Sequence, residues 1–299
     1  MKSHVLYVIG NGFDRHHKIS SEYADFGTYL RQVDPGLHGT FENYFSFKGN
    51  WADLENTLAN IDVDLIIDEA SNSLVPYSAE DWSDAYHHDY QYEIGRITES
   101  LSEGLKRRFT EWVCRLEIPD SLSCPVPLIN LDLNATYLTF NYTNTIQKLY
   151  GIAPAKILHI HNQAIDIGSD LVLGHGVSPK SIDSLNNGTD IESQDVRVTE
   201  ANEIIDDYFS KTYKPTHDVI AKHESFFHSL SGIRRIYVLG HSLSEVDWPY
   251  FKLISESTSP SNPDWMVSCH AESIQEKVHA LSQVGVAASK VKFVRLAEI

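Results

Sequence analysis

The stretch LYVIGNGFDRHHKISSEYADF, residues 6–26, decides how the chain folds, because it joins an apolar run to a glycine-rich turn. Residues 6–9 combine β-branched and aromatic side chains, as buried strands do. Gly10 and Gly12 follow at once, and glycine lets a backbone turn sharply or come close to another atom. The pattern predicts a strand that leads into a loop able to accept a phosphate or a ribose.

Similar apolar runs recur along the rest of the chain, and most of them end in a polar turn. They are ATYLTFNYTNT (135–145), KILHIHN (156–162), DLVLGHG (170–176), RRIYVLGHSLS (234–244), DWMVSCH (264–270) and VKFVRL (291–296). Helical patterns lie between several of them, such as 273–285, where Ile274, Val278 and Leu281 share a face and Gly285 is a C-terminal stop. This alternation predicts an α/β fold, a Rossmann-like and mostly parallel sheet with helices on both faces.

Between the first strand and residue 135 the apolar spacing changes to three and four, as on a helix face. One such stripe consists of Ile94, Ile97, Leu101, Leu105, Phe109, Trp112, Val113 and Leu116. A stripe of this kind indicates core packing more than a cofactor site. We therefore expect a mainly helical insertion at 46–130 within a Rossmann-like core at 1–45 and 131–299.

The composition excludes some classes of protein. With 24 Lys and Arg against 41 Asp and Glu, the formal net charge is -17, which argues against a nonspecific nucleic-acid binder. Cys114, Cys124 and Cys269 form no CxxC pair, so we expect ordinary reduced thiols. We also expect a soluble, cytoplasmic protein without a membrane partner, since there is no signal peptide and no apolar run of about 18 residues.

Polar clusters follow the predicted strands at the edge where open parallel sheets bind ligands. The candidate site residues are Gly10, Asn11, Gly12, Asp14, Asn141, Thr143, His159, His161, His175, Gly240, His241, Ser242 and Asp247. GNGFD has neither the full GxGxxG spacing nor the lysine of a phosphate-binding loop. GHSLS is not the GxSxG elbow, so a serine nucleophile is not well supported. Catalysis by a cysteine is less well supported still.

The tripeptide His159-Ile160-His161 places two imidazoles two residues apart, and on a strand they would point to the same face. That geometry suits metal ligation, or a general base with a supporting neighbour. It also suits two histidines that are simply hydrogen-bonded at a strand end.

Taken together, the motifs resemble the bacteriophage abortive-infection AbiH-like proteins. The matching segments are IGNGFD (9–14) with ISSEYADF (19–26), WADLE (51–55), TFNYTNT (139–145), HIHN (159–162), LGHG (173–176) and GHSLSEVDWPYF (240–251). They cover nearly the whole chain. The resemblance implies a role in phage defence, together with a phage-derived trigger or partner protein. It leaves open whether the chain forms a homo-oligomer.

The same layout is similar to the sirtuin-like fold, which binds NAD on a Rossmann-type sheet. This similarity implies that Asn141 holds the nicotinamide ribose or its attacking water, and that His161 is the general base. Asn162 stands where the sirtuin pattern has glycine. Three scattered cysteines cannot form the four-cysteine zinc module of a sirtuin deacetylase, so deacetylation is the least expected outcome.

Three hypotheses about function follow. The first is an effector that binds and cleaves NAD or a related nucleotide, with NAD as substrate or ligand and no metal; Gly10 and Gly12 would then turn their N–H groups to a pyrophosphate. The second is a metal-dependent nuclease or phosphohydrolase that uses His159, His161, His175, His241 and Asp14. The third is a non-catalytic nucleotide sensor that signals through a partner.

Overall fold

The computed structural model of the chain describes residues 3–45, 51–80, 82–188 and 194–299. Its sheet has six strands in the order β3-β2-β1-β4-β5-β6, and every neighbouring pair is parallel. The strands are β1 (Val5–Ile9), β2 (Thr136–Thr139), β3 (Ile157–His159), β4 (Arg235–Leu239), β5 (Asp264–Ser268) and β6 (Val291–Val294). The predicted Rossmann-like α/β fold is confirmed, and this strand order is that of dinucleotide-binding Rossmann sheets.

By compactness the chain divides into two units. The first comprises Met1–Glu22, Thr110–Val172 and Pro215–Ile299, and it contains the sheet. The second comprises Tyr23–Phe109 and Leu173–Lys214, and its described residues form helices and turns but no strand. The segment 173–214, which the sequence-based division assigned to the core, here lies with most of the predicted insertion. The boundaries at 45/46 and 130/131 stay a prediction.

Thirteen α-helices connect the strands in the described residues. They are α1 (Asn11–His16), α2 (Tyr23–Val33), α3 (Pro35–Tyr44), α4 (Leu54–Thr57), α5 (Val63–Ala70), α6 (Asp89–Glu99), α7 (Leu105–Cys114), α8 (Thr145–Tyr150), α9 (Val196–Lys211), α10 (Thr216–Lys222), α11 (Glu224–His228), α12 (Trp248–Thr258) and α13 (Ile274–Gln283).

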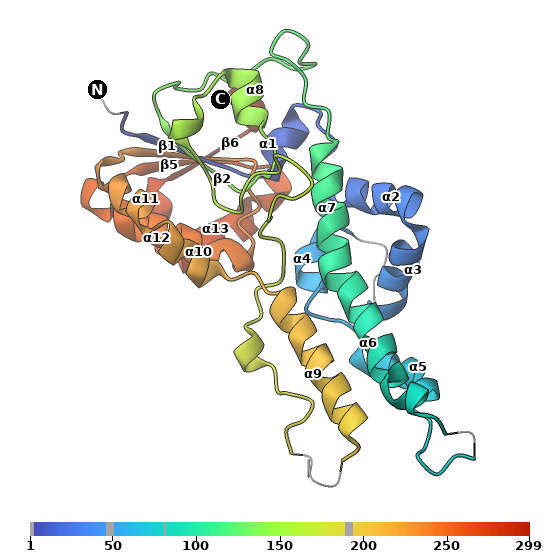
Figure 1. Cartoon of the computed structure of the whole chain (residues 1–299). Coiled ribbons are helices and arrows are strands. Elements are labelled where there is room, and N and C mark those ends of the chain that lie inside the picture. The colour runs from blue at the N-terminus through green and yellow to red at the C-terminus, as the bar shows by residue number, and fades with distance from the viewer. Residues whose placement is uncertain (1–2, 46–50, 81, 189–193) are drawn as a thin grey trace. The chain divides into compact units, whose positions relative to one another are not determined.

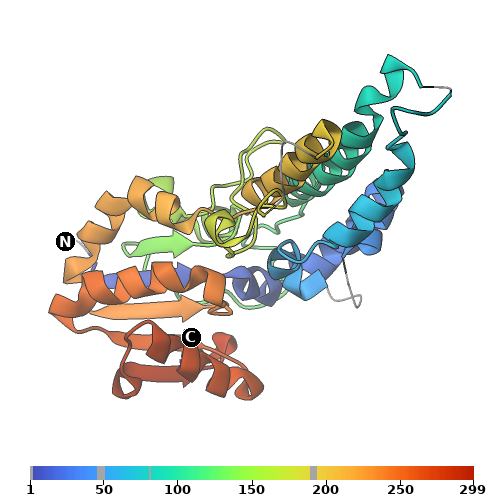
Figure 2. The ribbon, with the colours of Figure 1, turned by 90° about the horizontal axis from the view of Figure 1, so that it is seen from below.

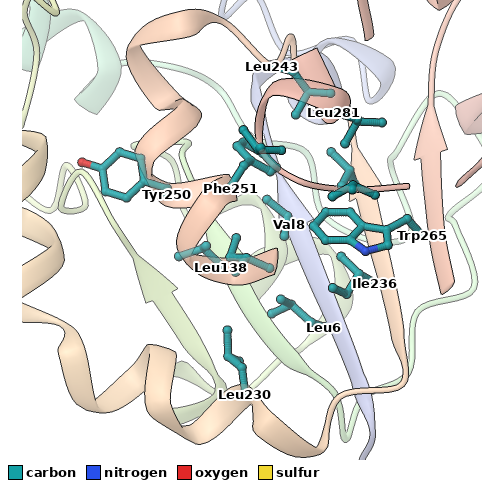
Figure 3. Packing of buried hydrophobic residues seen from close by; sticks show 14 of the residues in the cluster. Leu6, Val8, Leu138, Leu230, Ile236, Leu243, Tyr250, Phe251, Trp265 and Leu281 are labelled. Carbon is teal, nitrogen blue, oxygen red and sulfur yellow. The ribbon is translucent and has the colours of Figure 1, made fainter. Parts of the chain in front are cut away.

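Alternate residues of β1 enter two different cores, as the period of a strand dictates. Leu6 and Val8 join a cluster with residues of α10 to α13, among them Phe251 of α12 (Figure 3). Tyr7 and Ile9 face the opposite side, where α1 and α8 contribute apolar side chains. Helices therefore cover both faces, as predicted, and Figure 1 shows α8 on one side of the sheet and α10 to α13 on the other.

The second unit has its own core. Trp51 stacks on Phe41 with ring centroids 4.6 Å apart, and its indole lies against Gly27, where a Cβ would come within 2.5 Å of the ring. Helices α6 and α9 pack side by side (Figure 2). The stripe predicted for 94–116 is confirmed: its members are buried except for the half-buried Leu116, and those up to Phe109 belong to this unit.

Two local predictions are wrong. Residues 170–176 form no strand; Leu171 and Leu173 are buried without a strand ladder, and the segment makes one isolated bridge, from His175 to Tyr213. An apolar alternation reports burial, and a buried loop satisfies it as well as a strand does. On α13 the face predicted through Val278 is also misplaced, since Val278 is exposed and Lys277 is buried instead.

Candidate functional site

The turns after β1 and β4 interlock through their backbones. Gly10 N–H donates to the Leu239 carbonyl at 2.9 Å, and Gly12 N–H donates to the Gly240 carbonyl at 2.7 Å. A Cβ on Gly240, which has φ of +67°, would lie 2.1 Å from the amide nitrogen of Phe13. The glycines therefore let two loops from distant parts of the sequence touch.

This differs from the expectation that the N–H groups of Gly10 and Gly12 turn to a pyrophosphate, because both groups already donate to carbonyls of the β4 turn. Asn11 also has a structural partner: its side-chain amide donates to the Ser21 carbonyl at 2.8 Å and accepts from the Ser21 hydroxyl at 2.6 Å. The GNG turn is thus held in place by its own unit.

Asp14 lies at the centre of a buried polar cluster that joins the β1 and β2 turns. The Thr143 hydroxyl donates to Asp14 Oδ2 at 2.6 Å and lies 3.0 Å from the Thr145 hydroxyl. Asp14 is 1% exposed and Asn141 is 6% exposed. Asp14 Oδ1 and Asn141 Oδ1 make no hydrogen bond of good geometry to the described residues, so acceptor atoms remain for a ligand or water.

Burial raises the pKa of Asp14 to about 6, because the charged carboxylate loses its hydration. Side-chain hydrogen bonds from Thr143, Thr145 and Asn141 favour the charged form and lower the pKa in part. Near neutral pH this group can therefore both hold and release a proton, which is unusual for an aspartate.

A second buried cluster joins the turns after β3 and β4. His161 Nε2 lies 3.9 Å from Asp247 Oδ1, and His241 Nε2 lies 3.6 Å from Asp247 Oδ2. All three side chains are nearly excluded from solvent, with exposures of 3%, 3% and 8%. A carboxylate between two imidazoles in a site of low dielectric can orient one ring and stabilise its protonated form.

Aromatic rings frame this cluster. Phe140, directly after β2, contacts His161 and His241 with ring centroids 5.2 and 4.3 Å away. Tyr250 of α12 lies 5.6 Å from His161, and Figure 3 shows Tyr250 beside Phe251 on that helix. The rings hold both imidazoles in place and keep bulk water out.

His159 does not share the surroundings of His161. Its Nδ1 lies 3.0 Å from the Asn141 carbonyl and its Nε2 lies 2.9 Å from the side-chain nitrogen of Gln147 in α8. The expectation that the two imidazoles point to one face is wrong, because β3 ends at His159 and the chain turns, with Asn162 at φ of +65°. Burial lowers the pKa of His159, so its ring is neutral at pH 7.

Lys277 and Ser268 are neighbours of the candidate site that the sequence did not predict. The Lys277 ammonium donates to the carbonyls of His241 and Ser268, both at 2.8 Å. The Ser268 hydroxyl accepts from Gly240 N–H at 2.8 Å. The available signal was a lysine three residues after Ile274 and four before Leu281, on the apolar face of a helix.

His175 lies in the second unit. Its side chain is fully buried. Its backbone N–H donates to the Thr212 carbonyl, and its backbone carbonyl accepts from the backbone N–H of Lys214. The buried Lys214 ammonium lies 3.3 Å from Glu55 of the WADLE segment. Asp53 occupies the N-cap position of α4 without a side-chain hydrogen bond to the helix backbone, and it accepts from the Asn56 side chain at 2.7 Å. Lys214 therefore links the two segments: its backbone N–H binds His175 of LGHG, and its ammonium lies beside Glu55 of WADLE.

Ser242 is exposed beside His241. Across the described ranges, no three or more His, Cys, Asp or Glu side chains are grouped so that they could hold a metal ion. In the same ranges, no helix has both the length and the apolar character that a membrane span needs.

Comparison with known proteins gives one match. The family model described as "Bacteriophage abortive infection AbiH" matches residues 6–269. Searches of curated proteins and of solved structures found no match to the chain.

Proposed function

Because the chain belongs to the bacteriophage abortive-infection family AbiH, we propose that it is a phage-defence effector that binds NAD and cleaves its nicotinamide–ribose bond. The observation that carries the proposal is the buried His161–Asp247 pair at the carboxyl edge of a Rossmann-ordered sheet. Asn141 follows the neighbouring strand β2, and its Oδ1 has no hydrogen bond of good geometry to the described residues. Ligands of open α/β sheets bind at this edge.

The reaction needs a base, a positioned water and an environment that tolerates positive charge. Water oxygen attacks C1′ of the ribose as the C1′–N bond breaks, and nicotinamide leaves with the bonding electrons. His161 takes the proton of the attacking water, and the Asp247 carboxylate stabilises the imidazolium that forms. Asn141 orients the water or a ribose hydroxyl.

The interlocked glycines limit where the nucleotide can lie. Since the N–H groups of Gly10 and Gly12 are already bonded, we place the ribose near Asn141, Thr143 and Asp14, where acceptor atoms remain. An Asp14 carboxylate beside the ribose would also favour the positive charge of an oxocarbenium-like transition state.

The test compares wild type with His161→Ala and Asn141→Ala, both with purified protein and NAD and in cells during phage infection. The matched controls are His270→Ala and Asn144→Ala, which remove the same side chains at exposed positions. We expect wild type and controls to release nicotinamide, and His161→Ala to lose about 10²–10⁴-fold in rate.

Cellular NAD is measured because the activity can depend on infection. If NAD stays constant in infected cells and with purified protein, the proposal is wrong. Release that a chelator abolishes would favour the metal-dependent hypothesis, and protection that persists in both variants would favour the sensor.

A further inference from the structure

The turn after β4 wraps around the ring of His241. Leu243 has φ of +65°, a left-handed conformation that leucine seldom adopts. Two hydrogen bonds hold it there: Leu243 N–H donates to His241 Nδ1 at 2.9 Å, and the Leu243 carbonyl accepts from Trp248 Nε1 at 2.9 Å. A strained backbone kept in place in this way often marks a functional site.

The hydrogen bond from Leu243 fixes the tautomer of His241. A backbone N–H can only donate, so Nδ1 must carry its lone pair and the one proton of the neutral ring sits on Nε2. Protonation of Nδ1 would break this bond. His241 is therefore neutral and presents an N–H from its Nε2 atom.

This N–H faces Asp247. The distance from His241 Nε2 to Asp247 Oδ2 is 3.6 Å, which is an electrostatic contact rather than a full hydrogen bond. The Ser244 hydroxyl lies 3.3 Å from the same oxygen. The other oxygen, Oδ1, lies 3.9 Å from His161 Nε2.

A third contact holds the turn from the side of α13. The buried Lys277 ammonium binds the His241 carbonyl, so the residue is fixed at its backbone as well as at its ring. A residue held at both ends can orient a neighbour, but it has little freedom to adapt to a ligand.

We propose that His241 is a positioning residue, which holds the Asp247 carboxylate toward His161 through its Nε2–H and does not itself bind the nucleotide. The proposal rests on the function proposed above, in which His161 is the base. It replaces the assignment of His241 and Asp247 to cofactor binding with a supporting role for the base.

The first test needs no substrate. The ¹⁵N spectrum of histidine-labelled protein reports the tautomer of each ring, and His241→Gln assigns the His241 signals. We expect the Nε2–H tautomer of a neutral ring at neutral pH. An Nδ1–H tautomer or a protonated ring would overturn the proposal, whether or not the protein cleaves NAD.

The second test uses two replacements of similar size. His241→Gln keeps a donor near the Nε2 position, whereas His241→Asn keeps an acceptor near Nδ1 and loses the donor to Asp247. Titratable side chains that contact His161 or His241 include Asp247, Tyr142 and Tyr250. We expect His241→Asn, but not His241→Gln, to move the titration midpoint of His161. Equal shifts in both variants, or none in either, would contradict the positioning role.

Where NAD cleavage is measurable, separate measurement of kcat and KM gives a further check. We expect His241→Asn to lower kcat by about tenfold with little change in KM, and His241→Gln to stay within about threefold of wild type. A rise in KM in both variants would show that His241 binds the nucleotide.

Discussion

At the scale of single residues, Asp14 lies in a buried environment that destabilises its charged form. It is almost fully buried, and its main partner of good geometry is the neutral hydroxyl of Thr143. Buried carboxylates without a cation to balance them lower the stability of the folded state. Such a cost is common at functional sites and uncommon elsewhere.

We expect Asp14→Asn to change how stability depends on pH. The folded pKa of about 6 lies above the unfolded value of about 3.9, so the folded protein binds the proton more tightly. The contribution of Asp14 to the free energy of unfolding therefore falls as the pH rises from about 4 to 6, and is constant above that. The variant lacks this fall, and at pH 7 it should exceed wild type in stability by up to about 3 kcal/mol.

Urea unfolding at pH 4.5 and pH 7 measures this effect, and Asp264→Asn, at an exposed position, is the matched control. Identical pH profiles for wild type and Asp14→Asn would contradict the assignment. If Asp14 serves the reaction, the more stable variant should also be the less active one.

At the scale of elements, the turn after β4 connects the turn after β1 to α13. It carries His241, packs on the turn after β1 through Gly240, and receives the ammonium of Lys277 from α13. Loops that carry functional side chains are positioned by the scaffold beneath them, and here the scaffold includes a second loop.

Gly240→Ala tests this interlock. A Cβ there would lie 2.1 Å from Phe13 N, and the backbone conformation is left-handed as well. We expect a loss of about 3 kcal/mol or more in the free energy of unfolding. Gly151→Ala is a matched control, because Gly151 has φ of +64° with no atom near the added Cβ; it should cost only about 1 kcal/mol.

Denaturant unfolding of Gly240→Ala and Gly151→Ala measures the loss in free energy of unfolding for each variant. Equal losses would mean that the left-handed backbone alone, and not the contact between the loops, requires glycine at position 240.

At the scale of the whole molecule, the sequence predicted the architecture better than the contacts. The sheet and the carboxyl edge followed from strand periodicity and alternation, because these depend on local residues. The contacts of His161 with Asp247, and of Lys277 with the His241 carbonyl, join residues far apart in the chain. Loop backbones that close on each other also leave little local signal, so Gly10 and Gly12 suggested a phosphate instead.

The net charge of the protein predicts weak binding to DNA. With a formal charge of -17, the protein should not retard a DNA duplex in a gel at about 150 mM salt, because binding of a duplex depends largely on cationic contacts to phosphates. A mobility-shift series at increasing salt measures this. Tight binding with a steep salt dependence would contradict the expectation and favour the nuclease hypothesis.

During synthesis, β1 leaves the ribosome long before either of its neighbours. Val8 pairs with Leu138 and with Val238, so the strand at the centre of the sheet waits for most of the chain to be translated. At about 5–20 residues per second, that wait is on the order of 10–50 s. Asp247 is translated later still. A nascent chain that ends before Asp247 therefore lacks the cluster of His161, His241 and Asp247.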